Sequence, residues 1–233
     1  GRQARKAIRA AARANPAARV VVTGCGAQVE TDAYAAMPEV AEIVGNRRKL
    51  DPATWTVPAP ERVRIDDVMA PGPDPVPAAT AMRARTRAFL PVQNGCDHRC
   101  TFCVIPFGRG NSRSVPAAEV VAQVRALVAE GTREVVLTGV DLTAYGRDLG
   151  ETSLGALVRA ILRGVPDLDR LRLSSIDSVE ADPELVAAFA EEARLMPHLH
   201  LSLQAGDDLI LKRMKRRHGR DDAIRFCAEI RAL

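Results

Sequence analysis

Three cysteines lie within eight residues near the middle of the chain, in the segment GCDHRCTFC. Cys96, Cys100 and Cys103 have the spacing C-x3-C-x2-C and directly follow a predicted strand. Three thiolates on one tight loop can each hold one iron of a [4Fe-4S] cube and leave the fourth iron open. An open coordination position is typical of a catalytic metal centre. The pattern therefore predicts a catalytic iron–sulfur cluster.

A zinc site is the competing interpretation of the same loop. Together with His98, the three cysteines would supply the four ligands of a structural zinc site. Such zinc knuckles usually organise a small module, whereas this loop emerges from the first strand of a long α/β array. The context favours the cluster, and a zinc-stabilised RNA-binding module without catalysis stays the non-enzyme alternative.

Composition limits the classes of protein that fit. The chain has 233 residues and is 47% hydrophobic, enough for one sizeable core or for a medium domain with part of another. Five cysteines, three of them crowded together, argue for metal ligation in a reducing compartment rather than for disulfides. No apolar run approaches the roughly 18 residues of a membrane span, and no secretory start is present, which predicts a cytoplasmic protein without a membrane partner. The net charge of +4 is compatible with a polyanionic partner but does not identify one.

The first 50 residues predict a small α/β piece. A helix is expected up to Ala14, strands at 20–23 and 42–44, and a short helix at 32–36. From 51 to 85 prolines dominate, which predicts an inter-domain linker. The chain begins at Gly1 rather than Met and stops inside a predicted helix, so we expect both ends to be cut.

From residue 86 onward, strands and helices alternate. Strands are predicted at 88–93, 134–137, 170–174 and 198–203, and helices at 116–130, 153–162, 183–194, 207–216 and 221–233. This alternation predicts a parallel sheet with right-handed crossovers. The strands run into NGCDHRC, TGVD, SSID and QAG, which are polar or rich in glycine and cysteine. Because ligands bind at the carboxyl ends of such strands, we expect the functional site there.

These segments resemble a known family. The spacing C-x3-C-x-aromatic-C, with Phe102 as the aromatic residue, resembles the radical S-adenosylmethionine (radical SAM) signature. The segments VQNGCDHRCTFCVIPFGRGNSRSVP, LTGVDLTAYG, LRLSSID and HLHLSLQAGDDLILKRMKR resemble the methylthiotransferases, and VVTGCGAQ resembles the end of their amino-terminal domain. The resemblance implies an α/β chain: part of that amino-terminal domain over 1–50, the linker over 51–85, and a partial (β/α)6 barrel over 86–233 that is incomplete at its C-terminus.

The resemblance also implies an activity. The FGRGNSRSVP stretch and the last strand are most similar to the enzymes that add a methylthio group at C2 of N6-threonylcarbamoyladenosine at position 37, in the anticodon loop of tRNA. The sister activity on N6-isopentenyladenosine-37 and methylthiolation of an aspartate on a ribosomal protein remain alternatives. The implied cofactors are S-adenosylmethionine and [4Fe-4S] clusters. The implied partners are tRNA, an electron donor such as flavodoxin or ferredoxin, and an unknown sulfur donor.

In this family reading, residues at the strand ends bind S-adenosylmethionine. The open iron chelates its amino and carboxylate groups, and Phe102 lies beside its adenine. The other expected cofactor-binding residues are Thr138, Gly139, Asp141, Ser175 and Gln204. Residues of these types also end strands and cap helices without binding any ligand, so both interpretations stay open.

Two further cysteines lie outside the loop. Cys25 follows a strand in a Gly-Cys-Gly turn, where a lone cysteine is commonly a small buried hydrophobic residue. The resemblance implies instead that Cys25 is the third ligand of a second, auxiliary [4Fe-4S] cluster whose other two ligands lie upstream of Gly1. The full-length enzyme would then hold two clusters, of which this chain fully ligates one. Cys227 is expected in a helical core, and the cationic run 212–218 is interpreted as ordinary helix C-terminus chemistry.

Overall fold

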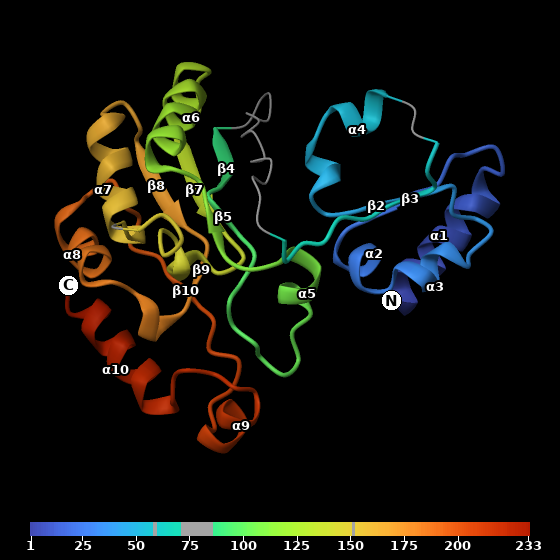
Figure 1. The fold of residues 1–233 in the computed structure, drawn as a ribbon. Coiled ribbons are helices and arrows are strands. Elements are labelled where there is room, and N and C mark those ends of the chain that lie inside the picture. The colour runs from blue at the N-terminus through green and yellow to red at the C-terminus, as the bar shows by residue number, and fades with distance from the viewer. Residues whose placement is uncertain (58–59, 71–85, 151) are drawn as a thin grey trace. The chain divides into compact units, whose positions relative to one another are not determined.

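The computed structural model describes residues 1–57, 60–70, 86–150 and 152–233, which form two compact units (Figure 1). The first unit takes in Gly1–Val76 and Val104–Asn111, and the second takes in Pro77–Cys103 and Ser112–Leu233. Directly after the last cysteine of the loop, the chain therefore contributes one short segment to the first unit.

The first unit has a parallel sheet of three strands in the order β1-β2-β3. These strands are β1 (Val21–Thr23), β2 (Glu42–Val44) and β3 (Val63–Arg64). Its helices are α1 (Arg2–Ala14), α2 (Cys25–Val29), α3 (Thr31–Ala35), the 3-10 turn η1 (Arg48–Leu50), α4 (Ala53–Thr56) and α5 (Ile105–Arg109). The helix expected up to Ala14 and the first two expected strands are present.

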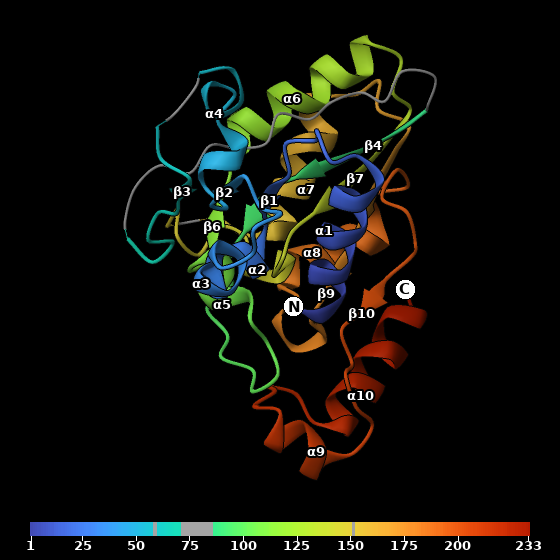
Figure 2. The same cartoon turned by 90° about the vertical axis from the view of Figure 1, so that its right-hand side faces the viewer.

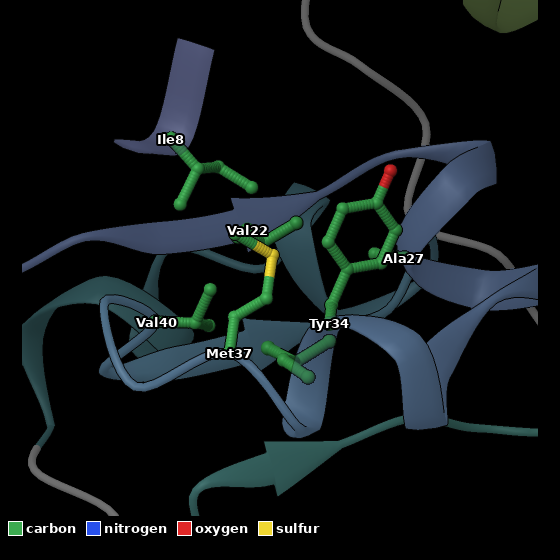
Figure 3. Close-up of a cluster of buried hydrophobic side chains, with 7 residues drawn as sticks. Ile8, Val22, Ala27, Tyr34, Met37 and Val40 are labelled. Carbon is green, nitrogen blue, oxygen red and sulfur yellow. The ribbon is translucent and has the colours of Figure 1, made fainter. Parts of the chain in front are cut away.

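A buried cluster holds this unit together (Figure 3). The cluster joins one face of α1, the strands β1 and β2, and the short helices that follow β1. Its members are Ile8, Val22, Ala27, Tyr34, Met37, Val40 and Ile43. The β-branched residues of β1 and β2 in this cluster suit a pleated, buried surface.

The strand β3 lies inside the stretch whose prolines predicted a linker. Its Arg64 is buried and donates to the carboxylate of Glu42 on β2 and, at 3.1 Å, to the carbonyl of Thr54. Breaking a buried ion pair by removing one partner is strongly destabilising, so the pairing fixes β3 against β2. Residues 51–57 and 60–70 therefore belong to the first unit, and 71–85 lie outside the described residues.

The second unit alternates strands and helices as the sequence predicted. Its strands are β4 (Arg87–Pro91), β5 (Gln93–Asn94), β6 (Arg113–Ser114), β7 (Glu134–Thr138), β8 (Arg170–Leu173), β9 (Ser175–Ile176) and β10 (His200–Leu201). Its helices are α6 (Ala117–Ala129), α7 (Leu154–Gly164), α8 (Pro183–Glu191), α9 (Asp208–Arg213) and α10 (Arg220–Arg231), with 3-10 turns η2 (Leu142–Ala144) and η3 (Ser178–Glu180).

The central sheet of this unit has the order β4-β7-β8, and all of its pairs are parallel. Pro91 pairs with Thr138, and Leu137 pairs with Leu173, so the three strands end at one edge. Figure 2 shows α6 and α7 on the same face of β4 and β7, and buried side chains of α7 such as Leu157 and Ile161 form the core there. The three loops that follow the strands consequently start side by side.

The fourth predicted strand is much shorter than expected. Only His200–Leu201 form β10, and they pair with β9 rather than with β8. The amide of His198 donates to the carbonyl of Met196 at 2.7 Å, so the chain is still in a turn around Pro197, where the strand was predicted to begin. In the part of the chain that the structure describes, no helix combines the length and apolarity needed to cross a bilayer.

Glu134, the first residue of β7, fixes the register of the central sheet. Its carboxylate lies 2.8 Å from Nε of Arg87 on β4, and 3.2 Å and 3.0 Å from Nε of Arg170 and Arg172 on β8. Burial alone would raise the pKa of Glu134, but the hydrogen bonds from the three arginines outweigh it and lower the pKa below its ordinary value.

Replacing Glu134 with Gln should therefore reduce the free energy of unfolding by roughly 2 kcal/mol at neutral pH. Because the folded state lowers this pKa, the stabilisation is present above the unfolded-state value of about 4.5 and is lost as the pH falls through the folded-state pKa. The difference between wild type and variant, measured by urea unfolding, should shrink below that pH. Glu130→Gln, at an exposed position, should change little, and an equal loss in the two variants would contradict the assignment.

Candidate functional site

The cysteine loop begins at the carboxyl edge of the central sheet. β4 is followed by β5, and Gly95 then adopts a left-handed φ of 74° that turns the chain into Cys96. The chain later returns through β6, which pairs antiparallel with β5. Both ends of the loop are thereby fixed to the sheet.

Gln93 connects this loop to the loop after β7. Its buried Nε2 donates to the carbonyl of Gly95 and to Oγ of Ser112, both at 2.9 Å. Its Oε1 accepts the backbone N–H of Asp141 at 2.8 Å. A Cβ on Gly139 would come within 2.9 Å of that same oxygen, so a larger residue there would have to displace the Gln93 amide. Gln93 was not singled out from the sequence, because an amide side chain in a strand carries no motif.

The three loop cysteines are free thiols with different surroundings. Cys100 is buried, whereas Cys96 and Cys103 are half-buried. The N–H of Cys103 donates to the carbonyl of Cys100 at 3.1 Å, which closes a tight turn. The thiol of Cys96 donates to Oδ2 of Asp141 at 3.4 Å, and burial together with that carboxylate raises its pKa to about 12. The predicted residue Asp141 thus lies beside the predicted ligand Cys96.

His98 is buried at the centre of a charged cluster. Its Nε2 lies 3.2 Å from Oε1 of Glu180 and 3.4 Å from Oδ2 of Asp141. The hydrogen bond with Glu180 raises the pKa of His98, with burial acting in the opposite direction. Burial works to raise the pKa of Glu180, but His98 and nearby arginines lower it to about 2. His98 therefore joins the cysteine loop to the turns after β7 and β9.

The same geometry bears on the zinc interpretation. Among the described residues, the ligand atoms of His98, Asp141 and Glu180 lie within 4.8 Å of one another, and no cysteine joins that group. Four ligands of one zinc ion lie about 3.8 Å apart, given Zn–S distances of about 2.3 Å. The set of three loop cysteines and His98 is thus not gathered around a single point. A cube binds each thiolate at a separate iron, so the donor set fits a cluster better.

A second charged group lies beside Cys100. The side chains of Arg216 and His218 are both buried, and both contact the carboxylate of Asp177. The interpretation of 212–218 as ordinary helix-end charge was wrong for these two residues, because the chain after α9 folds back under the cysteine loop. The N–H of Thr101 donates to the carbonyl of Met214 at 3.2 Å, and Figures 1 and 2 both show the loop reaching α9.

The other predicted cofactor-binding residues occupy the expected strand ends in varied environments. Phe102 is 54% exposed on the loop, and Thr138 and Ser175 are half-buried at the end of β7 and in β9. Gln204 is exposed and has a φ of 66°, a left-handed conformation that a non-glycine residue rarely adopts. Such strain is common at ligand sites, although strain alone does not identify a ligand.

Cys25 belongs to the first unit, where it begins α2 after Gly24, whose φ is 101°. Its Sγ lies 3.7 Å from Nδ2 of Asn46, which also donates to the carbonyl of Gly108 on α5. A Cβ on Gly108 would come within 2.7 Å of the Cys25 Cβ, so α5 can pack against α2 only through a glycine. Cys25 is half-buried in this contact and is therefore not a fully buried core residue.

The chain is similar to known proteins along its whole length. The chain is 47% identical over its whole length to the threonylcarbamoyladenosine tRNA methylthiotransferase MtaB of Rickettsia prowazekii, of which it covers 55%. It is 39% identical over 93% of its length to the tRNA-2-methylthio-N(6)-dimethylallyladenosine synthase of Paracoccus denitrificans, of which it covers 49%. The chain thus spans about half the length of the curated relatives it matches.

A solved structure gives a further likeness at the level of the fold. The radical S-adenosylmethionine methyltransferase TsrM from Kitasatospora setae superposes on 62% of this chain and 28% of its own, with a TM-score of 0.50 and 22% sequence identity. The family model described as "Radical SAM superfamily" matches residues 90–233, which is more than half of the chain. The chain therefore belongs to the radical SAM superfamily.

Proposed function

We propose that this chain is part of a methylthiotransferase that modifies tRNA, adding a methylthio group at C2 of N6-threonylcarbamoyladenosine-37. The observation that carries the proposal is the cysteine loop at the carboxyl edge of a parallel sheet, in a chain 47% identical to an enzyme named for that activity. The relative named for the dimethylallyl nucleoside is 39% identical, which favours the threonylcarbamoyl substrate. A tRNA substrate also agrees with a cytoplasmic location.

In this proposal Cys96, Cys100 and Cys103 hold a [4Fe-4S] cluster. When bound, the cluster supplies the electron that cleaves S-adenosylmethionine to a 5′-deoxyadenosyl radical. The chain's own part is to hold the three thiolates. The hydrogen bonds of Gln93 and the ion pair of His98 with Glu180 fix the loop that carries the thiolates.

The residues that follow the strands are the proposed contacts of S-adenosylmethionine. Exposed Phe102 would lie against the adenine, and the loop after β7 would receive the amino group of the methionine moiety. The further proposed contacts are Thr138, Gly139, Asp141, Ser175 and Gln204. Burial raises the pKa of Asp141, with His98 partly offsetting it. In this environment the ionised carboxylate would be stabilised by accepting a hydrogen bond from a charged amino group, because such hydrogen bonds are stronger than neutral ones.

Cys25 is the proposed ligand that the first unit contributes to an auxiliary cluster. Lys49 lies nearby with its Nζ 2.7 Å from Oδ1 of Asn46, and burial followed by repulsion from Arg109 lowers its pKa. One thiolate cannot hold a cube, so further ligands would have to come from outside this chain.

The proposed electron donor of the enzyme is a flavodoxin or a ferredoxin.

The proposal is tested by nucleoside analysis of tRNA from a bacterial strain without its own enzyme of this kind. Expression of the full-length protein that contains this chain should restore the 2-methylthio derivative of N6-threonylcarbamoyladenosine. Cys100→Ala should restore none of the product and form no 5′-deoxyadenosine in vitro, because the cube loses a ligand. Cys227→Ala, which removes a half-buried thiol of α10, should retain both activities.

Other products would favour the alternatives. Methylthiolation of isopentenyladenosine-37 alone would favour the sister enzyme, and a methylthiolated aspartate on a ribosomal protein would favour the third activity. Retained 5′-deoxyadenosine formation by Cys100→Ala would contradict the radical assignment. A colourless, zinc-containing protein after anaerobic iron reconstitution would favour the RNA-binding module.

The iron content of the chain itself should distinguish the two cysteine sites. After anaerobic reconstitution, residues 1–233 should bind about four irons, all lost when the three loop cysteines are replaced by Ala and little changed by Cys25→Ala. About eight irons in the wild-type chain would contradict the divided ligand set. Loss of iron in the Cys25→Ala variant would contradict the assignment of the cluster to the three loop cysteines.

A further inference from the structure

Arg216 approaches one of the proposed cluster ligands directly. Its Nη1 donates toward Sγ of Cys100 at 3.8 Å, within the range for a hydrogen bond to sulfur. The Arg216 side chain is 8% exposed, and Cys100 is the loop cysteine that is buried. The contact therefore forms in a largely dehydrated environment, where an N–H bond to sulfur is stronger than in water.

The guanidinium is held in this position from its other side. Nη2 of Arg216 donates to the carboxylate of Asp177 and, at 3.0 Å, to the carbonyl of Ser202. The second oxygen of Asp177 lies 3.3 Å from Nδ1 of His218. His218 is buried, and its Nε2 lies 3.0 Å from the carbonyl of Leu203. Arg216 is consequently aimed at the sulfur before any cofactor binds.

The arrangement is costly to maintain without a function. Nε of Arg216 is buried and has no hydrogen-bond partner among the described residues. Replacing a buried ion pair by apolar residues is often neutral or stabilising, so stability alone does not explain this one. A buried arginine N–H directed at sulfur is what tuning of a thiolate ligand requires, because hydrogen bonds to cysteine sulfurs help to set cluster potentials.

We propose that Arg216 raises the reduction potential of the cluster by donating a hydrogen bond to the Cys100 sulfur, and that Asp177 and His218 position it for this purpose. The inference rests on the proposed ligation of the cluster by Cys100. One-electron reduction adds negative charge to the cube and its thiolates, so a fixed N–H donor stabilises the reduced form more than the oxidised form. Arg216 is thus a positioning residue that acts through a ligand.

The test is a redox titration of the reconstituted protein, followed by electron paramagnetic resonance without S-adenosylmethionine. All proteins carry Cys25→Ala, so that the cluster on the loop is the one titrated. Arg216→Met should make reduction about tenfold less favourable, which is a downward shift of about 59 mV for one electron. Arg216→Lys keeps the charge without the planar fork and should show a smaller shift in the same direction. Arg213→Met, at an exposed position on α9, removes the same charge and should leave the potential unchanged.

Each outcome decides the inference. A lowered reduction potential in Arg216→Met supports the inference. If Arg216→Met binds no iron, a lowered potential in Arg216→Lys supports it instead. A full iron content with an unchanged potential overturns it while the proposed function stands. If affinity for S-adenosylmethionine alone falls, Arg216 contacts that cofactor and the inference is wrong. A wild-type protein that binds no cluster overturns the inference and the proposed function together, and that result is recognised by its iron content.

Discussion

The parallel register of β4, β7 and β8 is the constraint on which the site in the second unit depends. Because Pro91 pairs with Thr138 and Leu137 with Leu173, the three strands end level with one another. A shift of one residue in β7 would turn its alternate side chains to the opposite face and would move Asp141 away from Cys96. Glu134 opposes such a shift by binding arginines on both neighbouring strands. The ion pairs at one end of the sheet thus support the placement of Asp141 beside Cys96 at the other.

Buried charge is concentrated at the carboxyl edge of this sheet. Asp141 and Glu180 face His98, and Asp177 faces Arg216 and His218, so each carboxylate lies beside a basic side chain. Pairing offsets much of the desolvation penalty of these charges, yet apolar residues at this edge would often give an equally or more stable fold. Proteins commonly accept such a cost where a site must be held rigid before its ligand binds. The two charged groups contact different cysteines, Cys96 through Asp141 and Cys100 through Arg216.

The sequence predicted the elements more reliably than the contacts between them. Hydrophobic periodicity and β-branched residues were enough to predict α6, α7 and the strands of the central sheet, because the burial pattern of those segments is regular. The cysteine spacing and the polar strand ends predicted a site at the carboxyl edge of the sheet, where the structure brings Asp141 beside Cys96. The roles of Gln93 and Arg216 were not predictable in this way, since each depends on partners more than 15 residues away. The strand β3 was not predicted because the prolines around it indicated a linker. The buried ion pair that fixes β3 joins residues far apart in the sequence, so no local pattern reveals it.

The segment Val104–Asn111 illustrates this limit in the first unit. In the sequence it looks like a continuation of the cysteine loop, yet its helix α5 packs on α2 against Cys25. The contact depends on Gly108, where a Cβ would overlap Cys25, and on Asn46, which bonds the carbonyl of Gly108. A glycine inside a five-residue helix carries an entropic cost, so its presence is explained by the close approach that it permits.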